Sequence, residues 1–459
     1  MPPRSELILA AALLAGCASA PGVRPSAPAA PSAFTAVGAP AGAGWVEAFA
    51  DPALGELVAR ARRASPDLVV ARARHREALA LLRAEGAGDE PALVASAGVE
   101  ASRISVANGR FPPGLPRRTD VTAVGLHASW ELDFWGRQAA AVRAAAGDAR
   151  AAALTADQAD LALTAEVARL WFAVRAAREQ AACLSQEFTA REREMQILEK
   201  SVAAGVLPED PLSSARLAAA QAKVDEGLGL RRLAAAENAL RALVAAEPGS
   251  ALPASAGGPA AMPAFGPGLP SELLVRRPDL AAAAARLDAA VAREGAAVAD
   301  FYPSVTLGGQ AGWQADPASR IGKGAAGFWS LAPSVDLPLF DAGRREAGLE
   351  AARARLDGAA AEWTRAVLEA FREVEDALAD LRELARQEEL TGRVVEATQE
   401  RLRNAEARHR AGVAPEAEVV AAMRDEALAR RTLAGVVWER RQAAVRLAAA
   451  TGGGWTPKE

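Results

Sequence analysis

Apolar residues between positions 137 and 203 recur at alternating steps of four and three. The series runs through Leu163, Val167, Leu170, Val174, Ala177, Ala181, Leu184 and Phe188, and then Met195, Leu198 and Val202. A 3.5-residue apolar repeat is typical of a coiled-coil seam, whereas ordinary globular helices carry a broader stripe. The pattern predicts a helix over 137–203, about 100 Å long, that packs against partners along its whole length.

The same stretch has a counterpart later in the chain. Pro66-Asp67-Leu68 recurs as Pro278-Asp279-Leu280, an offset of 212 residues, and Gly136-Arg137 recurs as Gly343-Arg344, an offset of 207. Ordered matches at nearly constant offsets predict an internal duplication. We place the two repeats at 45–246 and 271–455, joined by a Pro/Gly-rich linker over 247–270. The second repeat then contains a second long helix, over 344–410.

Each long helix is followed by an Ala-Gly-Val turn and a proline, the residues expected where a helix ends. A return helix is therefore predicted at 212–246 in the first repeat and at 416–450 in the second. A shorter helical stretch opens each repeat, over 52–87 with a break at Pro66, and over 271–300.

Between the helical parts of each repeat, the apolar period changes to two. In the first repeat Val124, Leu126, Trp130 and Leu132 alternate with polar or small residues. The pattern predicts β-hairpins over 93–132 and 302–340, with strands near the ten-residue length that crosses a membrane. A soluble sandwich with one buried face is the alternative. The aromatic residues at the strand ends favour the membrane barrel, since such barrels carry interfacial aromatic girdles.

Four strands cannot close a barrel, and an open sheet edge in lipid leaves backbone groups unpaired. The chain must therefore combine its strands with those of further copies, and a pore wide enough for solutes favours three or more. The predicted fold class is mainly α-helical with membrane β-structure. It comprises a long α-helical coiled-coil barrel and a transmembrane β-barrel to which each chain gives four strands.

The N-terminus is predicted to direct export. In residues 1–16, Arg4 precedes an apolar run that is too short to span a bilayer. Leu14-Ala15-Gly16-Cys17 resembles the bacterial lipobox, which implies that Cys17 is acylated and begins the mature protein. Ala18 follows where an aspartate would imply retention in the inner membrane, so the resemblance implies the outer membrane. Residues 17–44, rich in Ala, Pro, Gly and Ser, are predicted to form a flexible lipid-anchored tether.

Composition narrows the functional classes. The net charge of −4, from 53 basic and 57 acidic residues, gives no basic bias toward nucleic acid. Three histidines and two cysteines leave little material for a metal cluster or a disulfide framework. We find no nucleophile–base pair and no phosphate loop, and we expect neither enzymatic activity nor a cofactor. Cys183 lies in the seam region and is expected to be packed rather than reactive.

Several longer blocks resemble the outer-membrane factor family, the TolC-like and NodT-like exit ducts of Gram-negative bacteria. They are Trp45 to Leu54, Trp130 to Arg137, Leu269 to Leu280, Phe301 to Ser304 and Pro338 to Arg344. The resemblance implies a homotrimer with a twelve-stranded barrel in the outer membrane and a twelve-helix tunnel across the periplasm.

The resemblance also implies the partners. They are a periplasmic adaptor protein, an inner-membrane pump of the resistance-nodulation-division type and outer-membrane lipid. The implied function is the passage of drugs or other small toxic solutes to the exterior. A type I secretion duct, a metal-efflux duct and a non-conducting structural coiled-coil lipoprotein stay open as alternatives.

Two sets of site residues follow from the resemblance. The turns containing Gly205, Val206, Gly412 and Val413 would form the periplasmic tip that docks the adaptor, where glycine permits close backbone approach. A candidate gate comprises Arg408, His409, Arg410, Glu416 and Glu418, in which Arg408 or Arg410 would pair with the carboxylates and hold the resting channel closed. A solvated charge cluster is the alternative. The chain departs from the family here, with His409 in place of a tyrosine and Ala421 where an aspartate is common.

Overall fold

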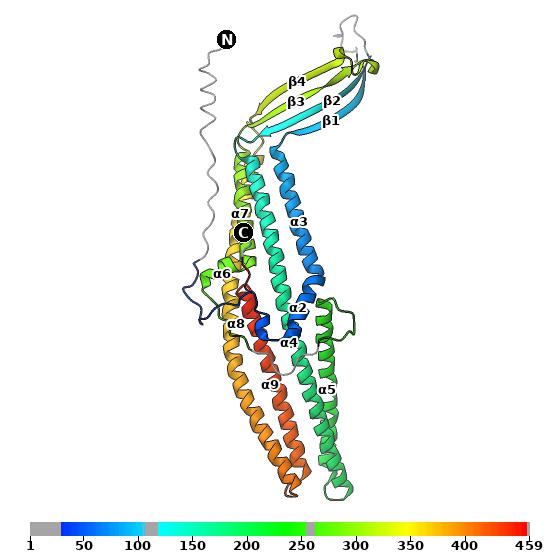
Figure 1. Cartoon of the computed structure of the whole chain (residues 1–459), viewed down its shortest axis with the longest axis vertical. Helices are drawn as coiled ribbons and strands as arrows, with labels where there is room; N and C mark the ends of the chain where they lie inside the picture. The colour runs from blue at the N-terminus through cyan, green and yellow to red at the C-terminus, as the bar shows by residue number, and fades with distance from the viewer. Residues whose placement is uncertain (1–28, 104, 106–117, 254–261, 457–459) are drawn as a thin grey trace. The chain divides into compact units, whose positions relative to one another are not determined.

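The computed structural model describes residues 29–103, 105, 118–253 and 262–456 (Figure 1). Long helices make up most of this part of the chain, together with a four-stranded antiparallel sheet. Among the described helices, none combines the length and the apolar character needed to cross a membrane. The chain divides into two compact units. We call them the strand unit (Arg74–Ala152 and Ala282–Trp363) and the hairpin unit (Pro28–Ala73, Ala153–Ala281 and Thr364–Glu459).

The strand unit is built on a sheet with the strand order β1-β2-β3-β4, in which each strand is antiparallel to its neighbour. The strands are β1 (Ala92–Arg103), β2 (Arg118–Leu132), β3 (Ser304–Ala315) and β4 (Gly327–Asp336). β1 and β4 form the two free edges of the sheet. Strand β4 ends earlier than the hairpin predicted over 302–340, because Pro338 has no N–H to give to a ladder.

Helices continue from the sheet. They are α3 (Pro66–Gly86), α4 (Arg137–Ala203), α7 (Pro278–Ala299) and α8 (Arg344–Arg410). The remaining helices are α2 (Pro52–Ala64), α5 (Glu209–Leu243), α6 (Pro270–Arg276) and α9 (Glu416–Ala450). Short 3-10 turns occupy Glu47–Phe49, Ala87–Asp89, Ala318–Arg320 and Gly324–Ala326.

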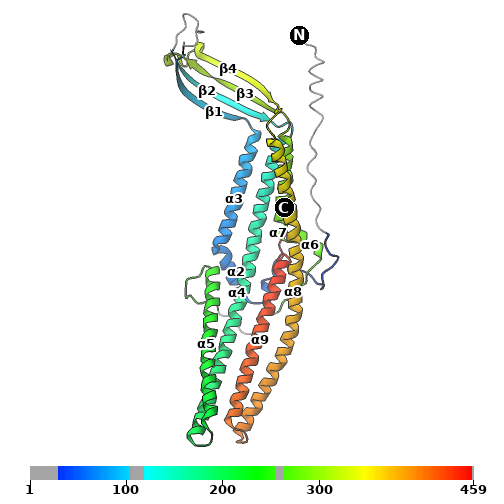
Figure 2. The ribbon, with the colours of Figure 1, turned by 180° about the vertical axis from the view of Figure 1, so that it is seen from behind.

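In the hairpin unit, α5 returns along α4 and α9 returns along α8. Figures 1 and 2 show the turns of these two helical hairpins side by side. The helices α4 and α8 have 67 residues each, and α5 and α9 have 35 each. The apolar series of α4 is packed as its spacing predicted, with Val167 and Val174 fully buried.

Some helix boundaries differ from the expectation. The first return helix spans Glu209–Leu243 rather than 212–246. It starts earlier because the N–H groups of a first turn lack intrahelical partners, so Pro211 is tolerated there. The helix expected over 271–300 is broken between α6 and α7. Arg277 adopts an extended conformation, φ −102° and ψ 121°, as a residue before proline prefers.

A cluster of large side chains forms the core of the hairpin unit, with Phe49, Trp171, Phe172 and Trp438 all fully buried. Asp51 lies within it and explains the block Trp45 to Leu54. Its carboxylate accepts hydrogen bonds from the backbone N–H of Ala53 at the start of α2 (3.2 Å), from Trp171 (2.8 Å) and from Arg175 (2.8 Å). These three hydrogen bonds satisfy the buried carboxylate and join the N-terminal segment to α4.

The structure corrects the prediction of a flexible tether for residues 29–44. Thr35 donates its N–H and hydroxyl to the carboxylate of Glu375, at 2.9 and 2.5 Å, and Phe34 and Ala41 are buried. The carbonyl of Ala39 accepts a hydrogen bond from Gly266 at 2.7 Å. A composition rich in Pro, Gly and Ser indicates flexibility only where backbone groups and apolar side chains find no partners.

Candidate functional site

The register of the sheet sorts its side chains onto two contrasting faces. Residues directly opposite each other in an antiparallel ladder point to the same face. One face is apolar and includes the row Ala95, Leu126, Ala311 and Trp329 and the row Leu93, Ala128, Gly309 and Leu331. The other face is mainly polar or small and includes Ser96, His127, Gln310, Ser330, Thr306, Ser334 and Asp336.

The apolar face is uncovered in the single chain, with Trp329 80% and Val99 73% exposed. On the polar face, His127 Nε2 lies 3.0 Å from the hydroxyl of Ser96. An apolar surface of this extent on a monomer marks a membrane or protein contact. The sheet therefore suits a boundary between an apolar medium and water.

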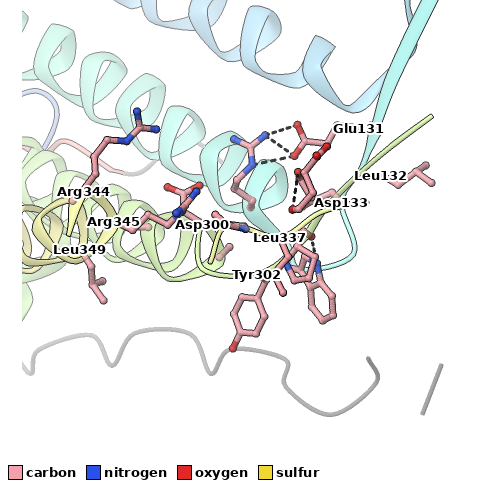
Figure 3. A pocket seen from close by; sticks show the side chains of 18 residues that line it. Glu131, Leu132, Asp133, Asp300, Tyr302, Leu337, Arg344, Arg345 and Leu349 are labelled. Atoms are coloured by element: carbon pink, nitrogen blue, oxygen red, sulfur yellow. Dashed lines mark hydrogen bonds and ion pairs between the residues drawn. The ribbon is translucent and has the colours of Figure 1, made fainter. Parts of the chain in front are cut away.

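A cleft of about 810 Å³ lies where the strands pass into the helices of the strand unit (Figure 3). Trp135 stacks on Tyr302, with ring centroids 5.1 Å apart, and donates its indole N–H to the carbonyl of Pro303 (2.6 Å). Figure 3 shows the acidic Glu131 and Asp133 on one side of the cleft and basic Arg344 and Arg345 on the other.

Charged residues at this cleft shape the starts of α4 and α8. Arg137 donates to both oxygens of Glu131 at 2.9 Å, and Asp133 accepts the N–H of Ala139 at 2.8 Å. Asp341 accepts the N–H of Arg345 at 3.2 Å and its guanidinium at 2.7 Å. The blocks that end in Gly-Arg are thus strand-to-helix turns with capping carboxylates, and Gly136 and Gly343 adopt φ of 74° and 85° in them.

The hairpin turns named as candidate docking tips share one backbone geometry. Gly205 and Gly412 have φ of 72° and 73°, and each turn makes the two hydrogen bonds of a Schellman motif. Gly205 N–H donates to Val202 and Val206 N–H to Ser201, at 2.9 and 3.0 Å. The second turn repeats this geometry at 2.9 and 3.0 Å.

The tips leave space around their glycines. A Cβ added to Gly205 or Gly412 would meet no atom within 4 Å, so backbone conformation alone requires glycine there. Val206 and Val413 are 74% and 68% exposed. Each turn therefore presents an uncovered valine next to an accessible stretch of backbone.

The candidate gate residues are divided between two kinds of contact. Arg408 donates to Glu418 at 2.5 Å, a pair that joins α8 to α9 within one hairpin. Glu416 instead accepts from Arg193 at 2.5 Å and joins α9 to α4 of the other hairpin. His409 Nδ1 lies 3.0 Å from the carbonyl of Ala414, and Arg410 donates to the carbonyl of Glu406 at 3.3 Å.

Further ion pairs along α4 and α9 were missed by sequence reasoning. Arg424 lies 3.5 Å from Glu194, and Arg431 lies 3.1 Å from Glu187. Both partners step by seven residues, so the pairs repeat at the heptad spacing. The seven-residue spacing of the charges within each helix was the clue that the sequence offered. It could not reveal the pairs, because the sequence does not show that α4 and α9 are neighbours. Arg191, which interrupts the apolar series of α4 between Phe188 and Met195, pairs with Glu194 at 3.2 Å.

Of the two cysteines, the structure describes Cys183. Cys17 lies outside the described residues. Cys183 is half-buried on α4, and burial raises the pKa of its thiol. Among the described residues, no group of three or more His, Cys, Asp or Glu is placed to hold a metal ion.

Comparison with known proteins gives the family. A model of the outer membrane efflux protein family matches residues 57–246 and 269–453. The chain belongs to this family. It is an efflux protein of the outer membrane, and the family's role is transport rather than catalysis.

Relatives with efflux functions cover most of the chain. Outer membrane protein OprJ of Pseudomonas aeruginosa is 34% identical over 71% of this chain and 68% of its own length. Toluene efflux pump outer membrane protein TtgF of Pseudomonas putida is 31% identical over 90% of this chain and 85% of its own. A Salmonella typhimurium relative named as a probable outer membrane lipoprotein, SilC, is 29% identical over 96% of this chain and 97% of its own.

Solved channels have the same fold as this efflux protein. The outer-membrane channel OprN superposes with a TM-score of 0.85 and 27% identity, covering 96% of this chain and 100% of that chain. The open state of the Neisseria gonorrhoeae MtrE outer membrane channel gives a TM-score of 0.81 and 27% identity, covering 94% of this chain and 98% of that chain.

Proposed function

We propose that three copies of this chain form an exit channel for a tripartite efflux pump. The observation that carries the proposal is the four-stranded sheet, which has one apolar face, one polar face and two free edges. Twelve such strands close into a barrel with lipid outside and water inside, so that every backbone group is paired. The long helices then line a tunnel that continues the barrel through the periplasm.

The internal duplication predicted from the sequence would suit this assembly. The family model matches two segments of similar length, and the two helical hairpins have equal helix lengths. If each chain contains two similar repeats, a trimer contains six similar sectors. We place the repeats at 45–246 and 271–455, as their sequences predict.

Attachment to the outer membrane would use two elements. Acyl chains on Cys17 would hold the N-terminus at the membrane, in accord with the lipoprotein name of SilC. The barrel would hold the chain independently of that anchor.

The pump partners would meet the channel at the hairpin tips. We assign adaptor docking to Gly205, Val206, Gly412 and Val413, because their backbone is accessible and the valines are exposed. The proposed solutes are drugs and other small toxic molecules. The names of relatives refer to antibiotics, toluene and solvents. A polar, mainly small lining restricts passage little, so the pump rather than the channel would select the solute.

We assign the resting closure to charged residues near these tips. Arg408–Glu418 would stiffen one hairpin, whereas Arg193–Glu416 would hold neighbouring hairpins together. The groups are largely exposed, and such pairs contribute about 0.2–1 kcal/mol each. Several weak pairs suit a closure that adaptor binding can open.

Membrane fractionation without the lipid anchor tests the barrel. Residues 1–17 are replaced by a cleavable export signal that carries no lipobox cysteine. We expect the protein to remain with outer membranes after high-salt and carbonate washing. Release of the whole population into the soluble periplasm would show that the sheet does not enter lipid.

A further inference from the structure

The four strands that the structure describes contain only two lysine or arginine residues, and these lie directly opposite each other. Arg103 ends β1 and Arg118 begins β2, and the two are partners in the ladder. Val99 and Thr122, also partners, lie four residues before Arg103 and four residues after Arg118. Because side chains alternate between faces, both arginines lie on the apolar face of the sheet.

Two positive charges thus lie side by side at one end of the apolar face. Like charges directly opposite each other in a ladder destabilise it. Arg118, with its side chain 72% exposed, donates its Nε to Asp120 at 3.1 Å. Within the described part of the chain, the Nη groups of Arg118 and the guanidinium of Arg103 have no acceptor. The pair therefore has donors available for an anion.

This end of the sheet is the one remote from the helices (Figure 1). β1 starts after α3 and β2 runs into α4, so the end of β1 and the start of β2 lie away from both helices. In the proposed channel the helices extend into the periplasm, and the arginines then lie on the exterior side. An arginine on the lipid face of a barrel costs much at the bilayer midplane and little near the headgroups. The pair therefore belongs at the level of the outer-leaflet headgroups.

A groove of about 650 Å³ lies on the same face. It lies between two neighbouring rows of the apolar face, one that contains Trp329 and one that contains Trp313. The two indoles are 80% and 43% exposed, whereas Ala97 and Ala311 are small and leave space beside them. Apart from Ser96, every residue that lines the groove is apolar or glycine. A groove of this size and chemistry suits a hydrocarbon chain.

The groove is within reach of a lipid whose headgroup lies at the arginines. Arg103 lies six residues after Ala97 of the groove, about 20 Å along the strand. Strands of a membrane barrel are tilted by about 45°, so this separation is about 14 Å along the membrane normal. The hydrocarbon of one leaflet is about 15 Å thick. An acyl chain therefore extends from the arginines to the groove.

A phosphorylated glycolipid satisfies both the charge and the groove. We propose that Arg103 and Arg118 bind a phosphate of a glycolipid in the outer leaflet, and that one acyl chain of this lipid occupies the groove beside Trp313 and Trp329. Guanidinium groups bind phosphate oxygens through paired, charge-assisted hydrogen bonds, and the phosphate neutralises the opposed charges. The outer leaflet of the outer membrane consists mainly of such glycolipids. The inference rests on the proposed channel and names the lipid that its barrel recognises.

Heat dissociation of the delipidated trimer in detergent tests the choice of lipid. Diphosphorylated lipid A, dephosphorylated lipid A, phosphatidylglycerol and inorganic phosphate are each added at the same concentration. We expect diphosphorylated lipid A to raise the dissociation temperature at least twice as far as any of the others. An equal rise with phosphatidylglycerol or dephosphorylated lipid A would overturn the proposal, and an equal rise with inorganic phosphate would show an adventitious ion only.

Arg103→Gln combined with Arg118→Gln tests the arginine pair. We expect this variant to lose at least two thirds of the rise that diphosphorylated lipid A produces. Without lipid, its dissociation temperature should equal or exceed that of the unaltered protein, because the opposed charges no longer repel each other. An undiminished rise in this variant would overturn the site, whatever its dissociation temperature without lipid.

Arg320→Gln combined with Lys323→Gln is the matched control. Both residues are exposed, and they lie in the connection between β3 and β4 at the same end of the sheet. The control removes the same charge without changing the ladder, and we expect it to keep the lipid-induced rise. Equal losses in the two double variants would show that the overall charge of this end attracts the lipid, and would contradict the arginine pair as its site.

Native mass spectrometry and the fractionation of washed membranes test the channel separately. A trimer that remains in washed membranes without preferring the phosphorylated glycolipid contradicts the lipid site alone. A monomer released into the soluble fraction contradicts the channel as well.

Discussion

A buried arginine, Arg277, explains the sequence block Leu269 to Leu280. Arg277 lies in the break between α6 and α7 with its side chain 8% exposed. It donates to Asp279 and Glu373, both at 2.7 Å, and to the carbonyl of Ala450 at 3.0 Å. Burial lowers the pKa of its guanidinium, but hydrogen bonding and the charges of Asp279 and Glu373 outweigh burial and raise the net pKa. One charge thus connects α7, α8 and the end of α9.

We expect Arg277→Ala to be among the most destabilising single changes in the hairpin unit. Removing the guanidinium takes the hydrogen-bond donor from the carbonyl of Ala450 and from two partly exposed carboxylates, at a cost of about 1–3 kcal/mol. Heat dissociation of the detergent-solubilised protein measures the loss. Arg401→Ala is the matched control, because Arg401 makes an exposed pair with Asp425 that contributes under about 1 kcal/mol. Equal losses in the two variants would contradict the role assigned to Arg277.

Cys183 gives a prediction for pH dependence. Because burial raises the pKa of its thiol, the reactive thiolate forms only at a higher pH than in a free cysteine. We expect alkylation by iodoacetamide at pH 7.5 to be slower in the folded protein than in the urea-unfolded protein. The rate should rise at a higher pH in the folded protein than in the unfolded one. Equal rates in the folded and unfolded protein at pH 7.5 would show that the thiol is free.

At the scale of elements, the helical hairpins depend on left-handed glycines at their turns. Gly412 has φ of 73° and no atom near its missing Cβ, so a substitution strains the turn without a clash. The cost of a β-branched residue in this conformation is about 1–2 kcal/mol, too small to unfold the long helices. The side chain would, however, cover the accessible backbone of the tip.

We expect Gly412→Val to abolish drug efflux while trimer assembly remains normal. Minimal inhibitory concentrations report efflux, and native gels report assembly. Gly392→Val is the control, because Gly392 lies within α8, also with open space around it, but in ordinary helical conformation. Normal drug resistance in Gly412→Val would exclude this turn from adaptor docking.

The sequence could predict those elements whose ends and faces depend on residues close together in the chain. The ends of α4 and α8 follow from Gly-Arg starts and Ala-Gly-Val turns, and the strand faces follow from an apolar period of two. The contacts of Phe34 and Thr35 could not be predicted, because their partners Phe371 and Glu375 lie more than 300 residues away. The pair Arg193–Glu416 was missed for the same reason, since its distance depends on how two hairpins pack.

At the scale of the whole molecule, the single chain leaves unpaired strand edges and apolar surface that further copies of the chain and lipid would cover. Its sheet has two free edges and an uncovered apolar face. The chain belongs to the outer membrane efflux protein family, and the outer membrane is an environment in which such an apolar face is stable. The central claim is that several copies enclose a water-filled path.

Planar-bilayer conductance of the purified, anchor-free trimer tests this claim most directly. We expect discrete conductance steps of uniform size. We also expect larger steps or longer openings for Glu416→Gln combined with Glu418→Gln, because both ion pairs at the tips are then weakened. An absence of steps from both proteins, in samples that native mass spectrometry shows to be trimeric, would contradict the channel.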